Sequence, residues 1–207
     1  MAALDEGQLV AALRKGDERA FRTVVQDYHR AMVRVASYHV PTRAIAEEVV
    51  QETWLAAIEG LNRFEGRSSF RTWVFRILTN LARTRGVRES WSVPFSSIDE
   101  PAVPRERFRT ADDNWPGHWA QPPRPWTDVP AEQVQSHETR SVVFDTIRTL
   151  PEHQREVIAL RDVEGWSAEE VCAALEISEV NQRVLLHRAR SRVRLALERH
   201  FDSVVTA

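Results

Sequence analysis

The sequence predicts an all-α protein of two small helical domains joined by a long linker rich in proline and tryptophan. Apolar residues recur every three or four positions before residue 90 and after residue 140, which is typical of amphipathic helices. No run alternates apolar and polar residues, so we expect no strands. Eight of the ten prolines lie between Pro94 and Pro130, and helices do not survive such proline density.

The part before the linker predicts three helices. Asp17 can cap the first, which ends before Pro41. Thr42 precedes the second helix, and a third is predicted over residues 69–85. The expected inner side of the second helix is formed by Ile45, Val49, Ala56 or Leu55, Ile58 and Leu61.

The linker is expected to separate a first domain over 14–90 from a second domain over 139–202, and itself covers 91–138. Four of the seven tryptophans fall in it, whereas flexible linkers are poor in aromatic residues. The segment is therefore expected to lie on a surface, either of its own domains or of a partner. These tryptophans are Trp91, Trp115, Trp119 and Trp126.

Two helices are expected directly after the linker. One apolar stripe runs from Val142 to Leu150. Pro151 then opens the next helix, at a position where the missing amide hydrogen costs nothing. Gly165 ends that helix, as a glycine in the left-handed conformation commonly does.

The last part of the chain predicts a helix-turn-helix. Ser167 and Glu170 have the spacing of a capping box at the start of a short helix. A three-residue turn over 176–178 follows, and Ser178 can cap a final helix that reaches about His200. In this motif the second helix enters the DNA major groove with its first residues facing the bases.

The second helix of this motif carries side chains suited to DNA. Asparagine and glutamine match the donor–acceptor pair of adenine, and arginine matches the two acceptors of guanine. Arg183, His187 and Arg190 share one helix face, on which they can meet phosphates. The candidate DNA contacts are Ser178, Glu179, Asn181, Gln182, Arg183, His187, Arg188 and Arg190.

Two basic blocks stand out in a chain of net charge −2. Residues 63–90 carry seven arginines and two acids, and residues 180–207 carry six arginines and two acids. Two compact blocks of this kind favour a polyanionic partner such as nucleic acid. In the first block, which includes Arg71 and Arg76, arginines alternate with aromatic residues, a combination used to bind single-stranded nucleic acid.

Several classes of protein are excluded or disfavoured. The single cysteine, Cys172, excludes an internal disulfide framework and a cysteine-rich zinc site. The seven histidines form no metal-binding pair, and no glycine-rich phosphate loop is present. We therefore expect no metal, no cofactor and no enzymatic activity. No apolar run is long enough to span a membrane and no secretion signal is recognisable, so we expect a cytoplasmic protein.

Motifs in three parts of the chain, in order, resemble bacterial sigma factors of the extracytoplasmic-function group. Residues 46–55 (AEEVVQETWL) resemble the segment of sigma domain 2 that docks on RNA polymerase, and residues 70–82 (FRTWVFRILTNLA) resemble its melting and −10 recognition segment. The motifs LPEHQR at 150–155, EGWS at 164–167 and LHRAR at 186–190 resemble sigma domain 4, which reads the −35 element.

This resemblance implies roles for individual residues. The expected polymerase contacts are Glu48, Gln51, Glu52 and Trp54. The expected −10 contacts are Arg67, Ser68, Ser69, Arg71, Trp73, Arg76, Asn80, Arg83 and Arg85, and the loop at 67–69 with Trp73 borders the site of a flipped base. The implied partners are core RNA polymerase, promoter DNA (double-stranded at −35 and single-stranded at −10) and an anti-sigma factor.

Two questions stay open at this point, namely whether the chain acts with RNA polymerase and what Gln182 does. A stand-alone helix-turn-helix regulator would explain residues 140–200 but would leave the acidic helix and the arginine–aromatic block unused. Gln182 stands where an apolar core residue is usual in the family. Either the recognition helix is slightly rotated or this glutamine reads DNA.

Overall fold

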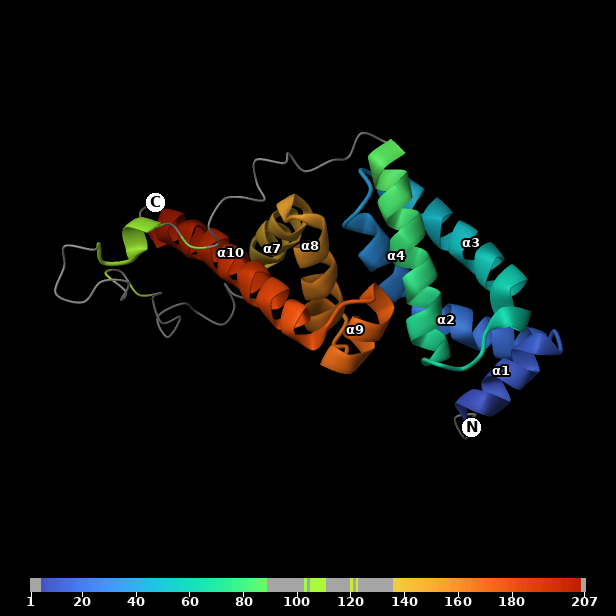
Figure 1. The fold of residues 1–207 in the computed structure, drawn as a ribbon. Helices are drawn as coiled ribbons and strands as arrows, with labels where there is room; N and C mark the ends of the chain where they lie inside the picture. The colour runs from blue at the N-terminus through green and yellow to red at the C-terminus, as the bar shows by residue number, and fades with distance from the viewer. Residues whose placement is uncertain are drawn as a thin grey trace. The chain divides into compact units, whose positions relative to one another are not determined.

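The computed structural model describes residues 5–88, 103, 105–110, 120, 122 and 136–205, and these residues contain helices and no β-strand (Figure 1). The predicted all-α class is thereby confirmed. The α-helices are α1 (Glu6–Arg14), α2 (Glu18–Ser37), α3 (Arg43–Gly60), α4 (Phe70–Arg88), α7 (His137–Thr149), α8 (Glu152–Ile158), α9 (Ala168–Leu175) and α10 (Glu179–Val205). Short helical turns are η1 (Leu61–Arg63), η2 (Arg105–Arg107) and η4 (Ala159–Val163). The four linker tryptophans lie outside the described residues.

The chain forms two compact units. The first comprises residues 1–92 and 159–182, and the second comprises residues 93–158 and 183–207. In the first unit α2, α3 and α4 pack on one another, while α1 packs on α2 and η1 (Figure 1). In the second unit α7 packs on α8.

Most predicted helix starts are confirmed by their caps. The Asp17 carboxylate accepts hydrogen bonds from the Arg19 and Ala20 amides, at 2.8 and 3.2 Å, and opens α2. The Thr42 hydroxyl accepts from the Ile45 amide at 3.3 Å and opens α3. Such side-chain caps satisfy backbone amides that have no partner within the helix.

The capping box of α9 is confirmed with both of its bonds. The Ser167 hydroxyl accepts from the Glu170 amide at 3.1 Å, and the Glu170 carboxylate accepts from the Ser167 amide at 2.7 Å. Gly165 has a φ of +70°, so the predicted left-handed glycine is also confirmed. The turn to α10 contains Glu176 at φ 55°, an unusual conformation for a residue with a side chain.

The predicted inner side of α3 is correct for Val49 but wrong for Leu55 and Ile58. Its buried residues are Ala46, Val49, Val50, Thr53, Trp54 and Ala57. Leu55 and Ile58, which the periodicity assigned to the core, are 62% and 51% exposed. Thr53 occupies the core because its hydroxyl donates to the Val49 carbonyl at 2.7 Å, which satisfies the buried polar group.

Helix α1 was not predicted from the sequence. It is short, and its first flanking residue, Asp5, makes no side-chain cap. Only Val10 and Leu13 are buried along it, so the apolar spacing gives a weak signal.

Helix α10 has the predicted two faces. Leu186, Ala189 and Leu197 are buried, whereas Arg183 and Arg190 are exposed.

Within the part of the chain that the structure describes, no helix has the length and apolar character needed to cross a membrane.

Candidate functional site

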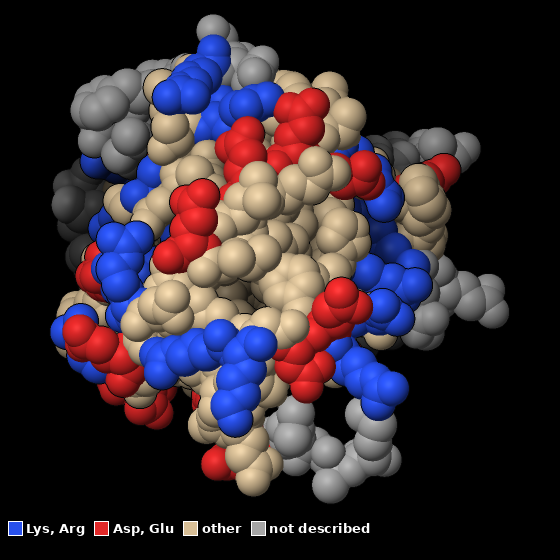
Figure 2. Space-filling model, turned by 90° about the vertical axis from the view of Figure 1, so that its right-hand side faces the viewer, with Lys and Arg blue, Asp and Glu red and all other residues tan. Residues whose placement is uncertain are grey.

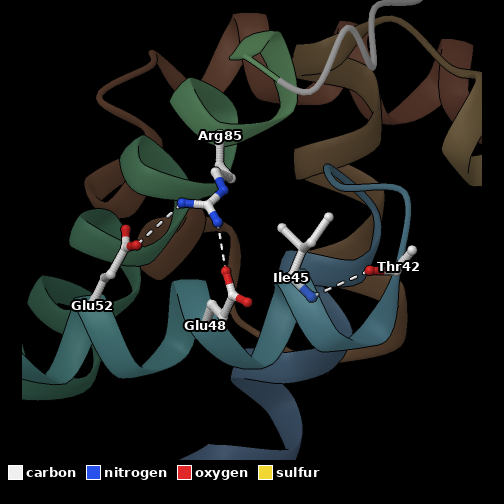
Figure 3. A network of polar contacts seen from close by, with 5 residues as sticks. All are labelled: Thr42, Ile45, Glu48, Glu52 and Arg85. Atoms are coloured by element: carbon white, nitrogen blue, oxygen red, sulfur yellow. Dashed lines mark hydrogen bonds and ion pairs between the residues drawn. The ribbon is translucent and has the colours of Figure 1, made fainter.

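A guanidinium group of α4 binds two carboxylates on the acidic side of α3. Arg85 of α4 donates to Glu48 at 2.5 Å and to Glu52 at 3.3 Å (Figure 3). The two carboxylates stay half-exposed, at 55% and 48%, whereas the Arg85 side chain is only 25% exposed. Arg85, predicted as a −10 contact, is thus engaged with two of the predicted polymerase contacts.

Two apolar side chains continue this acidic surface. Leu55 and Ile58 are exposed on α3, next to Gln51 and Glu52 in the helical repeat. We call Glu48, Gln51, Glu52, Leu55 and Ile58 the α3 face. The side of the molecule on which α1 and α3 lie in Figure 1 carries an uncharged, hollowed area framed by acidic and basic side chains (Figure 2). Exposed apolar residues rimmed by charges are typical of protein-binding surfaces.

Trp54 does not belong to the α3 face. It is 8% exposed and packs edge to face on Phe21, with ring centroids 5.7 Å apart. Its predicted contact with the polymerase is therefore corrected, because the indole is part of the core between α2 and α3.

An aromatic cluster lies beneath the start of α4. The rings of Phe64, Phe70 and Trp73 have centroids 5.0 to 6.0 Å apart. Phe64 and Phe70 are buried, whereas Trp73 is half-buried. A Cβ added to Gly60 would lie 3.1 Å from the Trp73 ring, so this position is glycine where the indole approaches the backbone.

The predicted base-capturing loop lines a cavity. A cavity of about 600 Å³ lies between α1 and residues 64–69, so Arg67, Ser68 and Ser69 all border it. Its volume is in the range typical of small-molecule sites, about 300–1,000 Å³. Trp73 does not line the cavity itself, but it supports Phe64, which does.

The remaining predicted −10 residues lie along α4. Asn80 is exposed and Arg83 is half-buried. Within the first unit, Arg76 pairs with Glu176 at 2.6 Å. Arg71 lies over the ring of Trp166, with its Cζ 4.4 Å from the centroid.

The first unit also contains an ion pair between α2 and the segment that precedes α9. Arg34 binds Glu164 with two hydrogen bonds of 2.8 and 2.9 Å, and its pKa is raised chiefly by that bonding. Burial raises the pKa of Tyr38 to about 12, and the Glu164 carboxylate adds to the rise.

The first turn of α10 presents the predicted recognition residues. The Ser178 hydroxyl accepts from the Asn181 amide at 3.2 Å, which caps the helix. Side chains exposed along α10 and its cap are Ser178, Glu179, Asn181, Arg183, His187, Arg188 and Arg190. Gln182 is 2% exposed, so the structure decides between the two alternatives for it. The glutamine is a core residue, and its predicted base contact is wrong.

Sequence reasoning missed the contribution of α1 to the cavity. Glu6 accepts a hydrogen bond from the Phe70 amide, and Arg14 donates to the carbonyls of Leu61 and Phe64. An acidic residue at the start of a short run with Leu9, Val10 and Leu13 was the signal that could have revealed this helix.

Both halves of the chain match known families. Residues 24–92 match the family described as Sigma-70 region 2, and residues 142–193 match the family described as Sigma-70, region 4. These ranges contain the α3 face, the helix α4 and most of the helix-turn-helix.

Similar proteins cover nearly the whole chain. It is 32% identical over 190 residues to the ECF RNA polymerase sigma-E factors of Escherichia coli (strain K12) and Salmonella typhi, which spans 92% of this chain and 93% of each relative. Two solved structures are also similar. One is CnrH in complex with the cytosolic domain of CnrY, with a TM-score of 0.62, 25% identity and coverage of 93% and 97% of the two chains. The other is the sigma factor RpoE of Bartonella quintana with the anti-sigma factor NepR, with a TM-score of 0.56, 20% identity and coverage of 86% and 96%.

Proposed function

Because this chain belongs to the extracytoplasmic-function group of sigma-70 factors, we propose that it binds core RNA polymerase and directs it to −35 and −10 promoter elements. The observation that carries this function is the pair of sigma regions in one chain, in order, with relatives that match over nearly its full length. It is a specificity subunit of the transcription machinery and not itself an enzyme. A stand-alone regulator would need only the helix-turn-helix, so that function would not explain the presence of region 2.

The proposed division keeps three parts. Residues 14–90 dock on the polymerase and act at −10, residues 139–202 read −35, and residues 91–138 connect them through the polymerase. The matches to regions 2 and 4 fall in or close to the two outer parts and support this division.

The α3 face is the proposed polymerase-docking surface. Glu48, Gln51 and Glu52 supply charge and hydrogen bonding, and Leu55 and Ile58 supply apolar area that water covers in the free chain. This combination, an apolar centre with a polar rim, is how protein interfaces gain both affinity and orientation.

The −10 strand is proposed to run along α4 and its preceding loop. Capture of an unpaired base costs a few kcal/mol of unstacking, so it needs both a receptive cavity and phosphate contacts. The cavity beside Arg67, Ser68 and Ser69 supplies the first, and exposed Asn80 and the arginines of α4 supply the second.

The −35 duplex is proposed to meet the start of α10. Asn181 and Arg183 are the candidate base readers, and His187, Arg188 and Arg190 are candidate phosphate contacts. Ser178 and Glu179 lie at the positively polarised end of the helix, close to the groove edge in this geometry.

An anti-sigma factor is a further partner, since CnrH was solved with the cytosolic domain of CnrY and the Bartonella factor with the anti-sigma factor NepR. We place the protein in the cytoplasm, where RNA polymerase works.

Run-off transcription tests the whole proposal. Bacterial core RNA polymerase is assayed on a genomic promoter library with and without this protein. The expected result is a set of new transcripts whose promoters share a −35 and −10 pair at fixed spacing. If the polymerase works with another sigma factor but gives no such transcripts here, while the chain alone binds duplex DNA tightly, the stand-alone regulator is the correct function.

A further inference from the structure

The cavity beside the −10 loop has one wall that the family resemblance does not account for. Helix α1 contributes Glu6, Gly7, Val10, Ala11 and Arg14, and the loop 64–69 contributes the opposite wall. The wall on α1 is small and apolar in its middle and charged at both ends. A flat heterocycle fits such a site, because its faces need apolar contact and its edge needs polar partners.

The two charged ends of α1 hold the loop at both of its ends. Arg14 donates to the carbonyls of Leu61, at 3.3 Å, and of Phe64, where the loop begins. Glu6 accepts from the amide of Phe70, directly after the loop ends. The shape of the cavity thus depends on these two contacts.

The carboxylate of Glu6 has acceptor capacity left over. Its Oε1 accepts from the Phe70 amide, Oε2 has no hydrogen-bond partner among the residues that the structure describes, and the side chain lines the cavity. An ionised carboxylate only accepts hydrogen bonds, so it favours a base edge that donates one. Thymine is the one DNA base without an exocyclic amino group, and its single ring N–H donor lies between two carbonyl oxygens that a carboxylate repels.

We propose that Glu6 is a specificity-determining residue of this cavity, which receives an unpaired −10 base that carries an amino group and rejects thymine. Arg14 is a positioning residue that keeps the loop in place. The inference rests on the proposed capture of a −10 base. Arg67 lies at the rim, where its exposed pair with Glu65, 3.0 Å long, can be exchanged for the phosphate of the captured nucleotide.

The Glu6→Gln variant tests the base preference of the cavity while it keeps the contact that holds the loop. The amide oxygen of glutamine can still accept from the Phe70 amide, but its NH₂ group then faces the cavity as a donor. The preference is therefore expected to turn toward thymine. Glu18→Gln removes the same charge from the exposed first turn of α2, away from the cavity, and is the matched control.

The test measures binding of holoenzymes, assembled with each variant, to single-stranded −10 oligonucleotides that carry each of the four bases at each position in turn. With the wild type and Glu18→Gln, we expect one position at which amino-bearing bases bind at least about tenfold more tightly than thymine, the size of a hydrogen bond to a charged group. With Glu6→Gln, this ratio should fall below one. Arg14→Met should weaken all four bases alike and leave their order unchanged.

The outcomes separate the two proposals. A wild-type holoenzyme that binds no −10 oligonucleotide contradicts the proposed function itself. A holoenzyme that binds with base preferences that Glu6→Gln leaves unchanged, while the variant melts at the wild-type temperature, overturns the role of Glu6. A change of order with Arg14→Met overturns its assignment as a positioning residue.

Discussion

Replacing Leu55 and Ile58 together by alanine is expected to weaken binding to core RNA polymerase without destabilising the chain. The two residues are 62% and 51% exposed in the free protein. Fully burying a leucine or isoleucine side chain is worth about 1.5–3 kcal/mol. Scaled by the exposed fractions, the pair contributes about 2–3 kcal/mol on docking, which corresponds to a rise in Kd of about 30- to 150-fold.

Titration of the fluorescently labelled chain with core polymerase measures this effect. Val163→Ala, at a residue that is 38% exposed and lies outside the α3 face, is the control and should bind like the wild type. Urea unfolding of the double variant should stay within about 0.5 kcal/mol of the wild type, as for surface substitutions generally. Equal polymerase affinities would refute the assignment of the docking surface. A weaker affinity with an equally reduced free energy of unfolding would show that the two residues act on the fold instead.

Four further predictions follow from described contacts. Asn181→Ala and Arg183→Ala should each weaken binding to a −35 duplex by about 1–3 kcal/mol per lost base contact, with Arg199→Ala as control, and unchanged affinity in both would exclude this recognition helix. Gln182→Leu should raise the free energy of unfolding by about 1 kcal/mol or more, because it removes a buried amide nitrogen that has no partner among the described residues, and the −35 preference should not change. Ser167→Ala should lower the free energy of unfolding by about 1 kcal/mol in urea titrations, because it removes the hydroxyl that accepts from the Glu170 amide and caps α9. The raised pKa of Tyr38, about 12 in the folded chain against about 10 when unfolded, favours its neutral form on folding. That stabilisation is complete below pH 10 and is lost as the pH rises toward 12, so urea unfolding of Tyr38→Phe should lack this part of the alkaline decline.

The features predicted correctly from the sequence are those that depend on residues close to one another in the chain. Caps such as Asp17, Thr42 and Ser167 were recognised because the side chain and its backbone partner lie within three residues of each other. The basic face of α10 was recognised because its charges recur at helical spacing.

The phase of α3 could not be predicted because periodicity assumes that apolar residues are buried. Leu55 and Ile58 break that assumption, and Thr53 breaks it in the opposite sense by satisfying its hydroxyl within the helix. The same exception makes the α3 face recognisable as a binding surface once the structure is known.

Contacts between residues far apart in the chain also could not be predicted from the sequence. Glu6 meets the Phe70 amide across 64 residues, and Arg85 meets Glu48 across 37. Nothing in the local pattern of either segment indicates its partner, so the α1 wall of the cavity and the contact of Arg85 with α3 emerge only from the packing of the helices.

On the proposal that the loop captures a −10 base, the contacts of Arg14 and Glu6 at its two ends also affect the rate of promoter opening. Fixing the backbone of one residue costs about 1–2 kcal/mol of conformational entropy, so an untied six-residue loop would lose about 6–12 kcal/mol on closing around a base. With Arg14 at one end and Glu6 at the other, much of that ordering takes place when the protein folds, before any DNA is present. If the loop captures a −10 base as proposed, this ordering by α1 lowers the barrier to strand separation, and variants that loosen α1 are expected to slow opening even where every nucleotide contact is intact.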